Sequence, residues 1–227
     1  MKQTVILTIL DGWGLGAKND SNPIHTADLQ TIKYIEENFS VGALNSSGIS
    51  VGLPLGEEGN SEVGHLTMGA GRTLYQHFLR INEAIEDGSF FKNRALLRAF
   101  SHAKKNNSSV HLVGLITKGN VHASLNHIKA LVEMAKKADL ADVYLHLFTD
   151  GRDSPPHSAL ELMRELDIEI KKIGVGTVAT ITGRYYALDR DNNWELTEKT
   201  YNAFMGKARK MSKEEAIQEA YNKKLND

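Results

Sequence analysis

A regular alternation of β-rich runs and helical patterns in the C-terminal part of the chain constrains the fold more than any other feature. Three apolar runs and three helical patterns follow one another along the sequence, at residues 109–116, 124–138, 142–149, 157–173, 175–182 and 194–205. Strands that alternate with helices form βαβ units, and their strands are parallel because each helix returns the chain to the same end of the sheet. A last helix is expected from Ser212, which stands three residues before Glu215 as in a capping box. The sequence therefore predicts an α/β fold with a mainly parallel sheet.

The N-terminal third of the chain has a different texture. Residues 4–10, TVILTIL, are a continuous β-rich run and predict a buried strand. A helix is expected over residues 27–38, followed by a long loop that contains one short strand. Helical patterns begin again at about Tyr75. We therefore expect two domains, with residues 1–75 in the first and residues 76–227 in the second.

Composition and charge exclude several classes of protein. The formal net charge is −1, so no basic field attracts nucleic acid. The absence of cysteine excludes disulfides and thiolate metal sites, and it fits a reducing cytoplasm. The first residues lack the pattern of a secretory signal peptide, and no apolar stretch is long enough to cross a membrane. We expect a cytoplasmic protein without a nucleic-acid or membrane partner.

Charged side chains follow the three predicted strands, at the point where each strand ends. They are His122 after the first strand, Asp150, Arg152 and Asp153 after the second, and Arg184 and Arg190 after the third. The carboxyl ends of parallel strands meet at one edge of the sheet, where α/β proteins bind their ligands. Three arginines and a histidine at one edge suit an anionic ligand such as a phosphate or a carboxylate. Surface ion pairs among these residues are the alternative, and the shared edge favours a binding site.

Ser61 lies between glycines in GNSEVGH, residues 59–65, and two interpretations of this setting are open. The glycines could serve a tight turn, or they could leave room for an incoming group at a nucleophilic serine. The string departs from the G-x-S-x-G elbow of α/β-hydrolases and has no evident adjacent base, so activation by a metal fits better than a serine hydrolase. The residues that follow could open a helix, whose N-terminus would favour a phosphate. His65 is a minor candidate for the same site.

Asp11 stands where the predicted first strand ends, and Gly12 follows it. A carboxylate at such a position is a common oxygen ligand for a divalent cation. An Asx-turn or a helix cap is the alternative interpretation.

Seven strings occur in one order along the chain: LDGWG, SVGLP, GNSEVGHL, GAGR, RINEAIEDGSFF, DGRDSPP and GRYYALDRD. Together they resemble the cofactor-independent (2,3-bisphosphoglycerate-independent) phosphoglycerate mutases over nearly the whole chain. The resemblance implies an alkaline-phosphatase-like domain with two divalent metal ions, usually manganese, and an inserted α/β phosphotransferase domain. Residues 1–75 would be the N-terminal part of the metal-binding domain, and residues 76–227 the N-terminal part of the inserted, substrate-binding domain.

The resemblance also implies roles for individual residues. Ser61 matches the serine that becomes phosphorylated, and Asp11 matches a carboxylate that binds one metal ion together with Ser61. Most other metal ligands are expected beyond residue 227. The positions that match substrate-holding residues are His122, Arg152, Asp153, Arg184 and Arg190. Asp153 resembles the group that exchanges protons with the substrate hydroxyls.

The implied reaction interconverts 3-phosphoglycerate and 2-phosphoglycerate through a phosphoserine, without a requirement for 2,3-bisphosphoglycerate, in a protein that is a monomer when complete. Two departures from the family pattern stand out, since Lys118 replaces an acid and Ser124 a histidine in TKGNVHAS. The family chain is also much longer, so we expect the 227 residues alone to be inactive. The alternatives are a truncated, non-catalytic phosphoglycerate-binding fragment, or another phosphomutase of the alkaline-phosphatase superfamily. The strings DGRDSPP and GRYYALDRD argue against the latter.

Overall fold

The structure is a computed structural model that describes residues 4–226. Its elements are α1 (Pro23–Thr26), α2 (Gln30–Asn38), η1 (Gly48–Val51), α3 (Ser61–Ala70), α4 (His77–Glu86), η2 (Phe90–Lys92), α5 (Arg94–Lys105), β1 (Val110–Ile116), α6 (Leu125–Lys137), β2 (Val143–Thr149), α7 (Ala159–Ile173), β3 (Thr177–Gly183), α8 (Arg184–Ala187), α9 (Trp194–Phe204) and α10 (Lys213–Asn222). The chain divides into two compact units, Met1–Arg80 and Ile81–Asp227. We refer to them as the N-terminal unit and the C-terminal unit.

The C-terminal unit is built on a parallel sheet in the order β1-β2-β3, which confirms the predicted α/β fold. The ends of the strands are in register, since Ile116 pairs with Thr149 and Thr149 pairs with Gly183. The next residue of each chain segment therefore emerges at the same edge of the sheet. This register is what positions the site described below.

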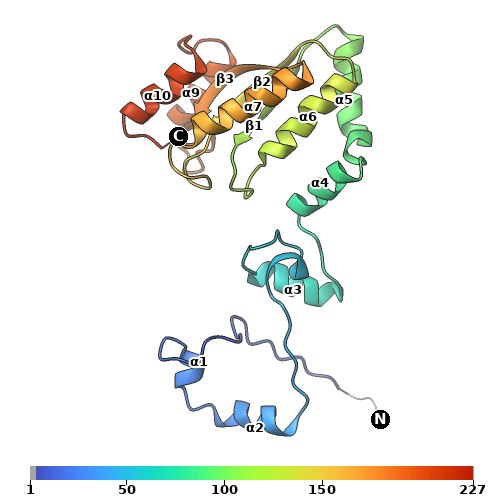
Figure 1. Cartoon of the computed structure of the whole chain (residues 1–227), viewed down its shortest axis with the longest axis vertical. Helices are drawn as coiled ribbons and strands as arrows, with labels where there is room; N and C mark the ends of the chain where they lie inside the picture. The colour runs from blue at the N-terminus through green and yellow to red at the C-terminus, as the bar shows by residue number, and fades with distance from the viewer. Residues whose placement is uncertain (1–3, 227) are drawn as a thin grey trace. The chain divides into compact units, whose positions relative to one another are not determined.

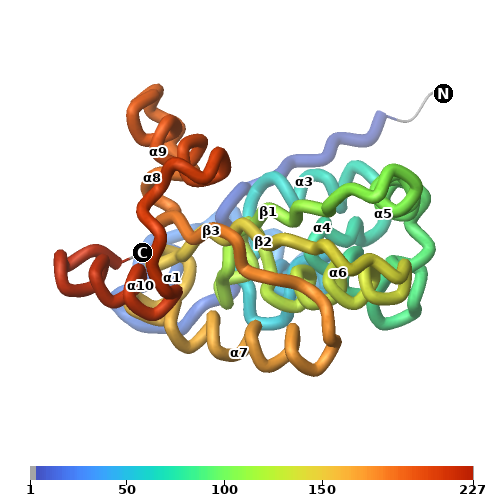
Figure 2. Tube along the Cα trace, turned by 90° about the horizontal axis from the view of Figure 1, so that it is seen from above, coloured from blue at the N-terminus to red at the C-terminus, as the bar shows by residue number. Residues whose placement is uncertain are grey.

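Helices α6 and α7 cover one face of the sheet, and α8 and α9 lie on the other (Figures 1 and 2). The core between the sheet and the first two helices contains buried side chains of all these elements: Ile116, Leu145 and Leu147 from the strands, Leu125, Ile128 and Val132 from α6, and Leu162, Met163 and Leu166 from α7. The periodic apolar positions of α6 and α7 thus face the sheet, as the helical patterns predict. Removing this apolar surface from water is the main stabilising contribution to the unit.

A polar chain crosses the opposite face of the sheet. The Nδ1 atom of His111 lies 2.8 Å from Nε2 of His146, whose Nδ1 lies 2.8 Å from Oγ1 of Thr180. The ring of Phe204 in α9 packs edge-on to the His146 ring, with centroids 5.0 Å apart. Burial and the neighbouring His111 lower the pKa of His146.

Helix α10 begins as the sequence predicts. The Ser212 side chain accepts a hydrogen bond from the backbone N–H of Glu215, and the Glu215 carboxylate accepts one from the backbone N–H of Ser212. This reciprocal capping box satisfies two of the N–H groups that a helix start leaves unpaired.

The N-terminal unit has helices and turns but no strand among its described residues. The prediction of a strand over residues 4–10 is therefore wrong, and Val5 and Leu7 are 90% and 75% exposed. A strand exists only where its backbone groups pair with a neighbour, and the sheet of the described residues consists of β1, β2 and β3. The short strand expected in the following loop is also absent from the described residues, where Gly48–Val51 forms η1 instead.

A small cluster of Val51, Leu53 and Val63 is the buried apolar core of this unit. It joins η1 and the loop after it to α3. No helix of the described residues has the length and apolar character that a membrane span requires.

Candidate functional site

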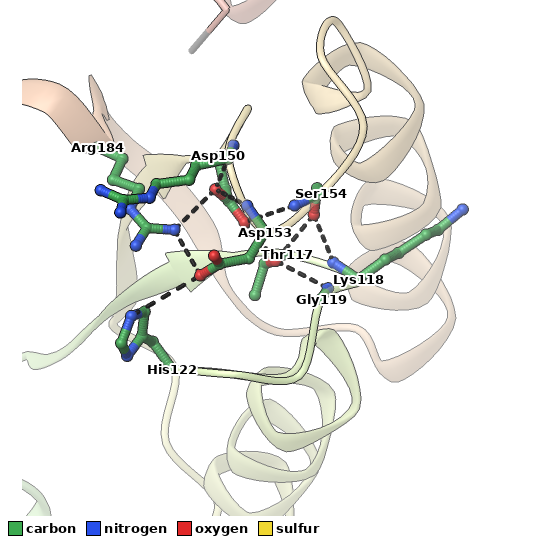
Figure 3. Close-up of polar contacts among 9 residues, drawn as sticks. Thr117, Lys118, Gly119, His122, Asp150, Asp153, Ser154 and Arg184 are labelled. Carbon is green, nitrogen blue, oxygen red and sulfur yellow. Dashed lines mark hydrogen bonds and ion pairs between the residues drawn. The ribbon is translucent and has the colours of Figure 1, made fainter. Parts of the chain in front are cut away.

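The register of the sheet brings together the residues that directly follow the three strands: Thr117 after β1, Asp150 after β2 and Arg184 after β3. Thr117 Oγ1 donates to Asp150 Oδ2 at 2.5 Å, and Arg184 Nη1 donates to Asp150 Oδ1 at 3.0 Å (Figure 3). The predicted meeting of polar side chains at one sheet edge is thus present, with Asp150 at its centre.

Asp150 is a fully buried carboxylate, with a side-chain exposure of 0%. Beyond these two contacts it accepts hydrogen bonds from the backbone N–H groups of Arg152 (2.9 Å), Asp153 (3.1 Å) and Ser154 (3.1 Å). Burial alone would raise the pKa of Asp150, but the hydrogen bonds from Thr117, the loop backbone and Arg184 outweigh burial and lower it below its ordinary value of 3.8. The carboxylate is therefore ionised at neutral pH.

Arg184 and Asp153 form the side of this cluster that is slightly exposed to solvent. Nη1 of Arg184 donates to Asp153 Oδ2 at 2.5 Å, and Nε2 of His122 lies 3.8 Å from the same oxygen (Figure 3). The side chains of Arg184 and Asp153 are 12% and 15% exposed, and that of His122 is 55% exposed. Burial would lower the pKa of Arg184, but its hydrogen bonds to Asp153 and Asp150 raise it. The arrangement presents a fixed guanidinium, a carboxylate and an imidazole to one point.

Two of the predicted arginines lie differently. Arg152 is exposed and joins the cluster through its backbone N–H. Arg190 is exposed in the segment between α8 and α9, and within residues 4–226 no hydrogen bond or ion pair links its side chain to Arg184, Asp153 or His122. The structure thus brings together His122, Asp153 and Arg184 of the predicted substrate-binding residues.

The loop after β1, which carries His122, is held against the loop after β2. The hydroxyl of Ser154 lies 2.8 Å from Thr117 Oγ1 and accepts from the backbone N–H of Lys118 at 2.8 Å. A Cβ on Gly119 would lie 2.6 Å from the Cβ of Asp153, so only glycine allows this approach. The two loops are therefore packed and hydrogen-bonded against each other.

The two departures from the family pattern lie in or beside this loop. Lys118 extends to Glu161 of α7, with Nζ 2.7 Å from Oε1, and hydrogen bonding to this carboxylate raises the pKa of Lys118. Ser124 is buried at the start of α6 and makes no side-chain cap.

In the N-terminal unit, Ser61 and Asp11 lie side by side. Ser61 Oγ donates to Asp11 Oδ2 at 2.7 Å, across 50 positions of sequence, and both residues are exposed. Asp11 lies in a turn closed by a hydrogen bond from Trp13 N to Leu10 O, with Gly12 at a φ of +81° that favours glycine.

Ser61 is the first residue of α3, but it does not cap the helix. Asn60 does so, since its side chain accepts from the backbone N–H of Val63 at 3.0 Å. The Ser61 hydroxyl is thereby left to Asp11, at the positive end of the helix. His65 approaches the backbone carbonyl of Ser61 at 2.7 Å and not its hydroxyl.

The two glycines that flank Ser61 have different surroundings. A Cβ on Gly59 would lie 2.9 Å from the carbonyl carbon of Ser46, so this glycine permits close backbone packing. A Cβ on Gly64 would meet nothing within 4 Å. Neither glycine has a positive φ, so no tight turn requires them, and the open space at Gly64 would also admit a Cβ. The nucleophilic role of Ser61 therefore stays a prediction.

The described residues offer part of a cation site at most. Asp11 Oδ2 and Ser61 Oγ are two adjacent, exposed oxygen atoms, and this donor type suits a hard divalent cation. Over residues 4–226 there is no group of three or more Asp, Glu, His or Cys that could hold a metal ion.

The sequence places Asp150 among the charged residues at the strand ends but assigns it no role of its own, and it does not single out Thr117 or Ser154. Their signal was available in part, because Thr117 and Asp150 each follow a buried strand directly. The contacts that make them important run to backbone N–H groups, which no residue pattern displays.

Comparison with known proteins places the chain in a family. Residues 81–227 match the family profile described as "BPG-independent PGAM N-terminus". The 2,3-bisphosphoglycerate-independent phosphoglycerate mutase of Clostridium perfringens (strain SM101) is 46% identical over 228 residues, which cover 100% of this chain and 44% of that protein. The enzyme of the same name from Clostridium botulinum (strain Langeland) is 48% identical over 204 residues, covering 90% of this chain and 40% of that protein. The chain thus spans less than half the length of these curated relatives.

A solved structure agrees with these matches. It is described as Leishmania mexicana phosphoglycerate mutase at low cobalt concentration, and it is similar with a TM-score of 0.68 and 32% identity, over 95% of this chain and 41% of that one. The chain therefore belongs to the 2,3-bisphosphoglycerate-independent phosphoglycerate mutase family.

Proposed function

We propose that the complete protein interconverts 3-phosphoglycerate and 2-phosphoglycerate through a phosphoserine at Ser61. Family membership and the names of the relatives support the reaction. The observation that carries the proposal is the hydrogen bond between Ser61 and Asp11, because it joins the two residues assigned to the phosphoryl-accepting centre.

In this proposal Ser61 Oγ attacks the phosphorus of the substrate. The bond from phosphorus to Oγ forms while the bond from phosphorus to the substrate oxygen breaks. The hydroxyl proton of Ser61 points at Asp11 Oδ2, which is a hydrogen-bonded acceptor for it. The phosphoryl group then returns from Ser61 to the other hydroxyl of the same glycerate.

Asp153 is proposed to give a proton to the oxygen that loses the phosphoryl group and to take one from the hydroxyl that receives it. Its position beside Arg184 and His122 supports this role, because it places Asp153 next to two groups that can bind an anionic substrate. Arg152 and Arg190 are proposed to complete the anion site. Because the glycerate stays bound while the phosphoryl group moves, both transfer steps take place within one complex, and the second step needs no new encounter.

We also propose two divalent metal ions, with Mn²⁺ as the favoured ion, and with Asp11 and Ser61 among the ligands. When bound, such an ion would stabilise the Ser61 alkoxide as a Lewis acid. The two oxygens of the described residues are far fewer than the six or so that such ions take, so the 227 residues alone are proposed to be inactive. We also propose that the complete enzyme is a monomer and lies in the cytoplasm.

The first test is the affinity of the 227-residue chain for 3-phosphoglycerate, measured by calorimetry. Arg184→Ala should weaken binding by about 1.5–3 kcal/mol, the contribution of a hydrogen bond to a charged group. Arg164→Ala is the matched control, because Arg164 is an exposed arginine on α7 outside the cluster. Equal affinities of all three proteins would refute the anion site.

A second measurement separates the enzyme from the alternatives. An enolase-coupled assay on the 227-residue chain with added Mn²⁺ should give no turnover. Turnover that Ser61→Ala abolishes would show that the chain is catalytically complete and that the proposed inactivity is wrong. Binding without turnover fits both the proposal and a non-catalytic phosphoglycerate-binding fragment, which only reconstitution with the rest of a family member distinguishes.

A further inference from the structure

We propose that Asp150 is a positioning residue of the substrate site, which aims the Arg184 guanidinium and fixes the loop that carries Asp153. The proposal rests on the proposed function, since it concerns how the phosphoglycerate site is held. It assigns to Asp150 no contact with the substrate.

The hydrogen bonds of Asp150 leave it no capacity to bind a ligand. Its Oδ1 accepts from Arg152 N, Asp153 N and Arg184 Nη1, and its Oδ2 accepts from Thr117 Oγ1 and Ser154 N. An ionised carboxylate has about four lone-pair positions, so the five donors around Asp150 leave none of these positions open. Because the side chain is also fully buried, Asp150 acts only through the groups that it holds.

The first of these groups is Arg184. Both of its contacts with carboxylates use Nη1, which lies between Asp150 and Asp153. A guanidinium has five N–H donors in a rigid fork, so these two carboxylates leave most of the fork for an anion. Asp150 is the fixed partner of the two, because its five hydrogen bonds hold it in place. Asp153 is the partner that can leave Arg184 when it engages a substrate hydroxyl.

The second group is the pair of loops. Oδ1 and Oδ2 accept from three successive backbone N–H groups and so set the turn on which Asp153 stands. Through Thr117, Asp150 also anchors the loop after β1, since Thr117 Oγ1 accepts from Gly119 N at 3.0 Å (Figure 3). His122 lies on that loop, 3.8 Å from Asp153. One buried carboxylate therefore sets the positions of all three residues that the structure gathers at the site.

The test uses the isosteric substitution Asp150→Asn in the 227-residue chain. The asparagine oxygen can replace Oδ1, but its amide NH₂ then faces the Ser154 N–H, donor against donor, and the charge opposite Arg184 is lost. We expect the affinity for 3-phosphoglycerate to fall about 10- to 100-fold, as misplaced site groups cause. We also expect the side-chain ¹⁵N–¹H signals of Arg184 to shift and to average, because the guanidinium can then rotate.

A matched control separates positioning from stability. Leu166→Ala removes a buried side chain of the same unit, far along α7 from the strand ends, and is expected to lower the unfolding temperature by a comparable amount. At a temperature where both variants are folded, Leu166→Ala should keep the Arg184 signals and the affinity of the wild type. An Asp150→Asn protein that also keeps both, or a Leu166→Ala protein that loses both, would overturn the proposal.

If Asp150→Asn does not fold, a measurement on the wild-type chain tests the proposal instead. The two Nη groups of Arg184 should give separate NMR signals before any ligand is added, because Asp150 restrains rotation of the guanidinium. A single averaged signal would overturn the proposal. Failure of the wild-type chain to bind 3-phosphoglycerate would count against the proposed function, whereas the Arg184 signals decide the present inference in either case.

Discussion

Replacing Arg184 by methionine should destabilise the C-terminal unit by about 3 kcal/mol. Methionine keeps most of the aliphatic volume, so the change removes chiefly the charge and the hydrogen bonds to Asp150 and Asp153. Breaking a buried ion pair by removing one partner costs about 3–5 kcal/mol. The lower end applies, because Asp150 keeps four other hydrogen bonds and Asp153 is partly exposed to water.

The loss is measurable as a change in thermal unfolding followed by far-ultraviolet circular dichroism. In a unit of about 150 residues, 1 kcal/mol shifts the unfolding temperature by about 2–4 °C, so the expected decrease is about 6–12 °C. Arg164→Met is the control and should shift the temperature little, since its side chain is exposed on α7.

The difference in unfolding temperature between wild type and Arg184→Met should also decrease in acid. Folding lowers the pKa of Asp150, so its ionised form stabilises the fold. This contribution is fully present above the ordinary pKa of 3.8 and is lost as the pH falls through the lower pKa of the folded state. The difference in unfolding temperature between wild type and Arg184→Met should therefore be large at pH 7 and should decrease only as the pH falls below 3.8. Equal unfolding temperatures at pH 7, or a gap that widens in acid, would refute the reasoning.

Two further predictions concern the loops and the sheet. Gly119→Ala should cost about 1–3 kcal/mol in the free energy of unfolding and weaken 3-phosphoglycerate binding, because its Cβ would overlap Asp153. Gly114→Ala, whose Cβ would meet nothing within 4 Å, should cost little, and equal effects in urea titrations would contradict the packing argument. The stability of the C-terminal unit should fall as the pH decreases below 6.5, because the pKa of His146 is lowered in the folded state and the unfolded chain binds the proton more readily. Thermal unfolding at pH 7.5 and 5.5 tests this, and the decrease should shrink in His146→Gln.

The C-terminal unit could be predicted from sequence because its signals are local. The runs that became β1, β2 and β3 and the helices between them are contiguous in sequence, and each carries its own periodicity. Parallel pairing then follows from the alternation, and with it the meeting of His122, Asp153 and Arg184 at one edge.

The rest depended on non-local information. Residues 4–10 have the composition of a buried strand, but a strand also needs paired neighbours, and none of the described residues pairs with them. The central place of Asp150 follows from the exact register of the three strand ends and from backbone N–H groups. Neither can be derived from residue types alone.

The central claim is that Ser61 accepts the phosphoryl group, and its most direct test is the site of phosphorylation in an active protein. A full-length protein can be assembled by joining this chain to the remaining part of the Clostridium perfringens relative, with which it shares 46% identity. After treatment with 3-phosphoglycerate and Mn²⁺ and rapid quenching, peptide mass spectrometry should find phosphate on Ser61, and Ser61→Ala should abolish both the phosphopeptide and the turnover. Phosphate on another residue, or turnover that survives Ser61→Ala, would contradict the account.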